Sequence, residues 1–156
     1  MKSNTYRILL FCSVLLLLCS SGVQAQNLRT KLANRGNKVM ICAHRSYWTN
    51  NPENSLSSVN AAINAGIPMI EIDIRTTCDG VLMVLHDDRL DRTTNGQGSI
   101  KKKTYDEVRT YRLYNGGTLT NEKVPTLDEM LDAAKGRVFV NLDIKDADEM
   151  DIYNLV

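Results

Sequence analysis

Both histidines of the chain stand directly after short apolar runs that predict buried strands. His44 follows residues 39–43, and His86 follows residues 81–85. Because the unperturbed pKa of an imidazole is about 6.5, two such groups at one rim can serve as general acid and general base at neutral pH. A single histidine is more often structural, but two at strand ends beside charged residues favour a catalytic pair.

Acidic residues with the spacing of a metal site lie on two predicted strands. Residues 69–75 alternate, so Glu71, Asp73 and Arg75 face one side and isoleucines face the other. The pair Glu71 and Asp73 is weak evidence alone, but Asp143 adds a third carboxylate from a later strand. Buried carboxylates repel one another and are costly to desolvate, so we expect a hard divalent cation, Ca²⁺ or Mg²⁺, as the cofactor.

Two cations accompany these groups. Arg45 follows His44 directly, and Lys145 follows Asp143 by two residues on the same predicted strand face. Both could bind a phosphoryl group, the arginine through two parallel hydrogen bonds. They could instead merely neutralise the carboxylates, and the sequence leaves both interpretations open.

The segments that carry these residues alternate between strand and helix patterns. Apolar or alternating runs predict strands at 39–43, 69–75, 81–85 and 138–145, and one apolar face predicts a helix at 55–65. The pairs Thr104 with Glu107 and Thr126 with Glu129 are capping boxes, each of which predicts the start of a helix. A further helix is expected within 146–156.

Strands with aliphatic side chains on one face and polar ones on the other predict an α/β fold of the TIM (β/α)8 barrel type. An open doubly wound sheet would place helices over the polar face, which is hard to reconcile with Glu71, Asp73 and Arg75. A whole barrel takes roughly 250 residues and eight strands, whereas about four strands can be counted here. We therefore expect about the first half of a barrel, whose exposed strand edges favour self-association.

Residues 1–25 have the pattern of a secretory signal peptide. An apolar run of about a dozen residues follows two basic ones, and this is shorter than the roughly 20 residues of a membrane-spanning helix. Cleavage after Ala25 would leave a domain at 26–156, secreted or periplasmic, without stable membrane insertion. Lipidation at Cys19 is the less favoured alternative, because Leu18 stands where a small residue is preferred.

Charge and cysteine content narrow the function classes. Loss of Lys2 and Arg7 with the signal would reduce the 19 basic side chains to 17, against 18 acidic ones. This balance gives no electrostatic support for binding nucleic acid. The remaining Cys42 and Cys78 do not define a disulfide framework, so we expect unpaired thiols.

Four stretches resemble, in order and spacing, the motifs of the glycerophosphodiester phosphodiesterase family. They are AHRSYWTNNPENS, EIDIRTTCDGVLMVLHDDRLDRTTNGQG, VPTLDEML and NLDIK, which together extend from residue 43 to residue 145. The resemblance implies a TIM barrel and a small-molecule glycerophosphodiester substrate. It implies that His44 and His86 are the catalytic pair. It also implies that Glu71, Asp73 and Asp143 are the metal ligands and that Arg45 and Lys145 bind the phosphate.

The resemblance also assigns roles to Glu53 and Asn54, which would lie at the rim and brace the histidine or the arginine; for Asn54, capping of the following helix is equally natural. Two positions depart from the family pattern. Ser46 stands where the family usually has glycine, and Asp143 stands where it usually has glutamate. If the first position needs glycine's backbone freedom, Ser46 perturbs the site. The shorter aspartate requires the metal to shift, a bridging water or a lower affinity.

The favoured hypothesis is a metal-dependent hydrolase that cleaves glycerophosphodiesters to an alcohol and glycerol 3-phosphate by acid–base catalysis. The alternative is a truncated, non-catalytic half-barrel that binds phosphate-bearing ligands. A barrel phosphodiesterase acting on membrane phospholipids is disfavoured, because no amphipathic docking helix follows the signal.

Overall fold

The structure is a computed structural model that describes residues 30, 33–34, 36 and 39–155. The chain divides into two units, Met1–Val39 and Met40–Val156, and the fold below is that of the second. The predicted signal peptide at 1–25 lies outside the described residues.

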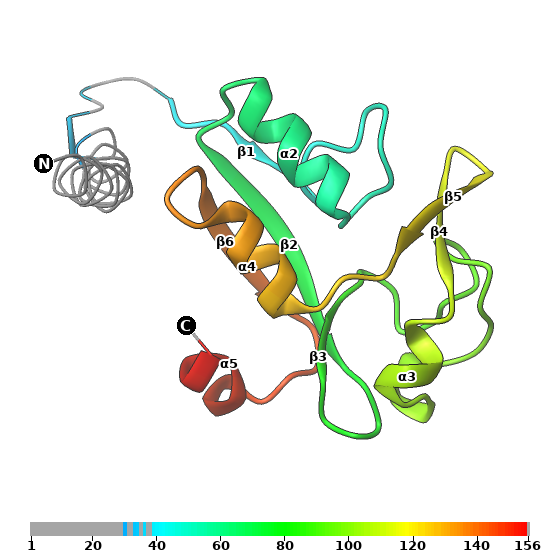
Figure 1. Cartoon of the computed structure of the whole chain (residues 1–156). Helices are drawn as coiled ribbons and strands as arrows, with labels where there is room; N and C mark the ends of the chain where they lie inside the picture. Colours follow the sequence, from blue (N-terminus) through cyan, green and yellow to red (C-terminus); the bar gives the residue numbers. More distant parts are fainter. Residues whose placement is uncertain (1–29, 31–32, 35, 37–38, 156) are drawn as a thin grey trace, which may run out of the picture. The chain divides into compact units, whose positions relative to one another are not determined.

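The centre of the fold is strand β2 (Met69–Thr76), which has partners on both sides (Figure 1). Strands β1 (Cys42–Ala43) and β6 (Phe139–Ile144) run parallel to β2, one on each side of it. Strand β3 (Leu82–Val84) is antiparallel and pairs with the last residues of β2. Parallel neighbours on both sides bury β2, as the isoleucine-rich sequence predicts.

Helices α2 (Leu56–Asn64) and α4 (Leu127–Ala134) cover the aliphatic face of this sheet. Their apolar side chains pack in one core cluster with Ile70, Ile72 and Ile74, all of which are fully buried. The polar residues between those isoleucines therefore face the opposite side. This is the arrangement expected for a barrel, with helices outside and polar groups inside. A last helix, α5 (Glu149–Leu155), follows β6.

Between β3 and α4 the chain forms a small insertion with its own apolar cluster. It contains the 3₁₀ helix η1 (Ile100–Lys102), helix α3 (Tyr105–Val108) and a hairpin of β4 (Arg112–Asn115) and β5 (Thr118–Lys123). Successive side chains along β3 point to opposite faces and so pack into two different cores. Val84 joins the main cluster, whereas Met83 and Leu85 join the cluster of the insertion. The short strand thereby attaches the insertion to the sheet.

The element predictions are largely confirmed, with three corrections. The capping boxes begin α3 and α4 at Thr104 and Thr126 as expected. The first strand is shorter than 39–43, because only Cys42 and Ala43 pair with β2. Strand β3 is not a fourth parallel barrel strand but the return arm of a hairpin that turns at Asp79 and Gly80. The β4–β5 hairpin was not predicted.

Candidate active site

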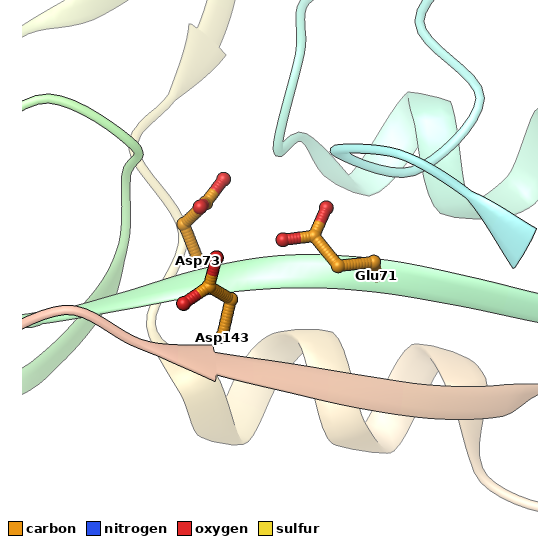
Figure 2. A group of neighbouring side chains, drawn as sticks. All are labelled: Glu71, Asp73 and Asp143. Carbon is orange, nitrogen blue, oxygen red and sulfur yellow. The ribbon is translucent and has the colours of Figure 1, made fainter.

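Three carboxylates converge on the open face of the sheet, on the side away from helix α4 (Figure 2). Glu71 and Asp73 come from β2 and Asp143 from β6, and each contributes an oxygen within 4.8 Å of the others. Parallel pairing produces this proximity, since Asp73 and Asp143 are direct register partners on adjacent strands. Glu71 and Asp73 are buried, whereas the side chain of Asp143 is 45% exposed. The structure thus brings together the residues predicted as metal ligands.

Lys145 lies against two of these carboxylates. Its Nζ is 2.6 Å from Oδ2 of Asp143 and 3.2 Å from Oδ1 of Asp73. The hydrogen bond from Lys145 to Asp143 raises the lysine's pKa, and the nearby Asp73 adds to this effect. Lys145 is therefore a cation under all physiological conditions. In this state it neutralises carboxylates, one of the two interpretations that the sequence left open.

The donor set fits a hard divalent cation. Three carboxylates and one ammonium leave two uncompensated negative charges in a largely buried cluster, which is costly without a further cation. The buried Oδ1 of Asp73 accepts no hydrogen bond among the described residues, and the ammonium of Lys145 at 3.2 Å is its ion-pair partner. Oxygen ligands alone, without histidine or cysteine, are those that Ca²⁺ and Mg²⁺ prefer.

The loop after β1 is held in an unusual backbone conformation next to Glu71. Arg45, Ser46 and Asn54 have φ angles of 51°, 65° and 54°, and no other non-glycine residue in the described part of the chain has a positive φ. The amide of Arg45 donates to Oε2 of Glu71 at 2.7 Å, and the amide of Ser46 donates to the carbonyl of Glu71 at 2.8 Å. Left-handed backbone at non-glycine residues is characteristic of functional sites.

Asn54 contacts a carboxylate rather than a helix. Its Nδ2 donates to Oδ2 of Asp73 at 2.8 Å, and its own amide donates to the carbonyl of Arg45 at 3.0 Å. The capping role considered for Asn54 is wrong, because Ser55 caps α2 through a capping box with Ser58. Asn54 tolerates the left-handed conformation because its short amide side chain can bond locally.

A chain of ion pairs extends from Arg45 away from the carboxylates. Both oxygens of Glu53 accept from Nη1 of Arg45, at 3.1 and 3.3 Å, and both accept from the guanidinium of Arg92 at 2.8 Å. Glu53 therefore braces Arg45, as predicted. Although burial opposes it, hydrogen bonds and charge from Arg92 and Arg45 lower the pKa of Glu53.

Arg92 continues the chain to a histidine. Its Nε donates to Oδ2 of Asp87 at 2.7 Å, and Oδ1 of Asp87 lies 2.7 Å from Nδ1 of His86. Hydrogen bonds from Arg92, and a weaker contribution from His86, hold the pKa of Asp87 well below its usual range. An ionised Asp87 fixes the imidazole with its proton on Nδ1, which leaves Nε2 free to exchange protons.

The two predicted catalytic histidines have different surroundings. Strand β3 returns along β2, and the amide of Leu85 donates to the carbonyl of Asp73 at 3.0 Å, which brings His86 alongside the metal-ligand strand. His44 follows β1 directly and is exposed, and its side chain makes no hydrogen bond or ion pair with other described residues. Only His86 is therefore oriented by a neighbour.

Sequence reasoning missed Asp87 and Arg92. Both lie within the motif that carries the family resemblance, but no role was assigned to them. The available signal was the carboxylate directly after His86, because an acidic neighbour is the usual partner for one imidazole nitrogen. The arginine could not have been found this way, since its contact with Glu53 spans 39 residues.

A partial barrel with converging carboxylates on its open face defines the class of the protein, and comparison with known proteins identifies its family. The model of the Glycerophosphoryl diester phosphodiesterase family matches residues 44–154. The chain is 37% identical over 111 residues to a glycerophosphodiester phosphodiesterase of Caldanaerobacter subterraneus subsp. tengcongensis, covering 69% of this chain and 46% of the relative.

Solved structures agree with this match. A glycerophosphodiester phosphodiesterase from Agrobacterium tumefaciens aligns with a TM-score of 0.72 and 34% identity over 76% of this chain and 52% of that one. An Oleispira antarctica phosphodiesterase, solved in complex with its product sn-glycerol-3-phosphate, aligns with a TM-score of 0.65 and 34% identity, covering 69% and 44%.

The chain therefore belongs to the glycerophosphoryl diester phosphodiesterase family, and its fold is a partial TIM barrel. It spans about half the length of the relatives it matches. Among the described residues, no helix has the length and apolar character needed to cross a bilayer. Cys42 and Cys78 are both unpaired, as predicted.

Proposed function

We propose that this protein is a metal-dependent hydrolase that cleaves glycerophosphodiesters to an alcohol and glycerol 3-phosphate. The observation that carries the proposal is the cluster of Glu71, Asp73 and Asp143, whose oxygens lie within 4.8 Å of one another beside Arg45 and Lys145. Family membership and the product bound to the Oleispira antarctica relative support the substrate class.

The three carboxylates would hold the cation, Ca²⁺ or Mg²⁺, with Asn54 keeping Asp73 in place. A divalent cation at such a site supplies Lewis-acid stabilisation of the charge that develops on a phosphate oxygen. A bound cation would balance much of the negative charge of the carboxylates. The ammonium group of Lys145 could then pair with the phosphate as well. Arg45 would bind the phosphate through its guanidinium, whose buried Nε has no hydrogen-bond partner among the described residues.

Proton transfer belongs to His44 and His86. One imidazole removes a proton from the attacking oxygen as the new P–O bond forms. That oxygen belongs to water or to the neighbouring glycerol hydroxyl; in the second case a cyclic phosphate forms, and water then opens it to glycerol 3-phosphate. The other imidazole donates a proton to the alcohol oxygen as its P–O bond breaks. Asp87 holds His86 with one nitrogen free, so this histidine needs no reorientation before transfer.

Release of glycerol 3-phosphate from several glycerophosphodiesters tests the proposal. The purified protein should be active with Ca²⁺ or Mg²⁺ and inactive after chelation. Glu71→Gln and Asp73→Asn should abolish the metal-stimulated activity and weaken calorimetric metal binding, whereas Asp132→Asn, an exposed residue of α4, serves as a matched control. Unchanged metal affinity in both site variants would remove Glu71 and Asp73 from the metal shell.

The histidines have their own test. His44→Ala and His86→Ala should each lower turnover by about two to four orders of magnitude, the usual contribution of general acid–base catalysis. Metal affinity should stay within error of wild type in both variants. Near-normal turnover in either variant would refute the paired assignment.

A second candidate function is favoured by the position of Lys145. Its ammonium group already joins Asp73 and Asp143, which lowers the need for a metal. In that case the protein is a non-catalytic half-barrel that binds phosphate-bearing ligands through Arg45 and Lys145. Binding of glycerol 3-phosphate that is insensitive to chelator, together with an absence of turnover, would select this candidate.

A further inference from the structure

A cavity beside the ion-pair chain has no role in the chemistry described so far. Its volume is about 330 Å³, within the range of small-molecule sites. The loop after β1 forms one wall with Trp48 and Asn51, and the β4–β5 hairpin forms the other with Tyr114 and its glycine turn. Glu53 and Arg92 line the side toward the candidate active site.

The two walls are joined by specific contacts rather than by chance proximity. Nδ2 of Asn115, at the tip of the hairpin, donates to the carbonyl of Asn50 at 3.0 Å. Farther along the hairpin, Glu122 accepts from the amide and the hydroxyl of Ser57 at 3.1 and 2.6 Å. Ser57 lies in the first turn of α2, where an acidic partner is favourable. The insertion is thus bonded to the barrel at two points, one of which, at Asn115, lies in the wall of the cavity.

The cavity lies one contact away from the proposed catalytic groups. Arg92 lines it and also donates to Asp87, which holds His86. Glu53 lines it and also binds Arg45. A diester whose phosphate lies between Arg45 and Lys145 would therefore extend one of its two substituents toward Trp48.

The charges of the lining argue against an ionic occupant. Glu53 is the carboxylate of the cavity, and both its oxygens accept hydrogen bonds from Arg45 and Arg92, so it is not free to bind an ammonium group. Arg92 in turn directs four hydrogen bonds to Glu53 and Asp87, which leaves little capacity for an anion. Its guanidinium would also repel a cationic head group. The ring faces of Trp48 and Tyr114 attract a quaternary ammonium group, but beside Arg92 and without a free carboxylate a neutral occupant fits better.

The remaining groups match a neutral polyhydroxylated alcohol. Trp48 is 47% exposed, and Tyr114 is half-buried, so both aromatic residues can pack against the C–H face of a ring or polyol. Thr49 and Asn51 offer side-chain donors and acceptors, and hydroxyl groups need both. We infer that this cavity is the subsite for the alcohol substituent of the diester, and that it selects polyols such as inositol or glycerol over choline. The inference rests on the proposed function.

Trp48 is the one tryptophan of the chain, so its fluorescence reports on the cavity without requiring turnover. In chelator, glycerophosphoinositol and glycerophosphocholine share the glycerol phosphate and differ only in the alcohol. Glycerophosphoinositol should give a saturable change in Trp48 emission with a Kd lower by about tenfold, equivalent to about 1.4 kcal/mol. Equal affinities, or tighter binding of the choline diester, would overturn the inference.

Variants separate the subsite from the reaction. The ratio of kcat/KM for the inositol diester over the choline diester should fall in Trp48→Ala, which removes the ring that packs against the polyol, and persist in Trp48→Phe. Tyr47→Ala is the matched control, because Tyr47 is the exposed neighbour of Trp48 and does not line the cavity. Turnover without the preference, or with a preference undiminished in Trp48→Ala, refutes the subsite alone. Absence of turnover refutes the hydrolase, and the fluorescence titration then still decides the subsite.

Discussion

Replacing Ser46 with glycine should stabilise the protein. Ser46 is buried, has a φ of 65°, and its hydroxyl has no hydrogen-bond partner among the described residues. A left-handed conformation costs a non-glycine residue about 1–2 kcal/mol, and a buried hydroxyl without a partner costs a further ~1 kcal/mol or more. Against this, glycine lowers the stability by about 0.4–1 kcal/mol, because it gives the unfolded chain greater conformational freedom. The net gain should be about 1–2.5 kcal/mol.

Thermal and urea unfolding of the purified protein measure this gain. A change of this size raises the melting temperature of a chain of this length by roughly 3–6 °C. Ser46→Ala is the control that separates the two causes, because it removes the hydroxyl but keeps a side chain at positive φ. If Ser46→Gly is no more stable than Ser46→Ala, the argument from backbone strain is refuted.

Three further predictions follow from the site. Asp143→Glu should lower the Kd for Ca²⁺ by roughly tenfold, about 1.4 kcal/mol, because the half-exposed position accommodates the longer carboxylate that the family resemblance favours; an unchanged calorimetric Kd would contradict this. Asp87→Asn should lower kcat by roughly 10–100-fold, the usual cost of losing an orienting partner. Since the folded pKa of Asp87 is lowered, wild type should be more stable than this variant above the ordinary value of 3.8, with the difference in urea midpoint shrinking as the pH falls below it. Residues 26–156 should self-associate in light scattering, because β6 pairs only with β2 among the described strands; a cooperatively melting monomer would show otherwise.

Local patterns in the sequence predicted the barrel elements well. The alternation from Met69 onward defines both faces of β2, and the capping boxes at Thr104 and Thr126 mark their helices. These signals succeed because the structure they specify lies within a few residues. The carboxylate cluster was also predictable, because parallel strands bring residues of the same face to neighbouring positions.

The errors concern pairing and long-range contacts. An apolar run such as 81–85 does not specify its direction, so the antiparallel pairing of β3 depended on the turn at Asp79 and Gly80, whose length permits a hairpin but not a crossover. The sequence does contain a signal for the hairpin of β4 and β5, which is its pair of adjacent glycines. Gly116 and Gly117 both have positive φ, as a two-residue hairpin turn requires, and they separate two alternating segments.

Arg92 explains why the insertion matters to the barrel's chemistry. It follows the buried Leu90 of the insertion's core, yet its guanidinium joins Glu53 of the β1 loop to Asp87 beside His86. One side chain thus lines the cavity and holds Asp87, which orients the histidine. A change at Trp48 should therefore alter selectivity between alcohols. Loss of Arg92 should alter selectivity and turnover together, because Glu53 and Asp87 would both lose their main cationic partner.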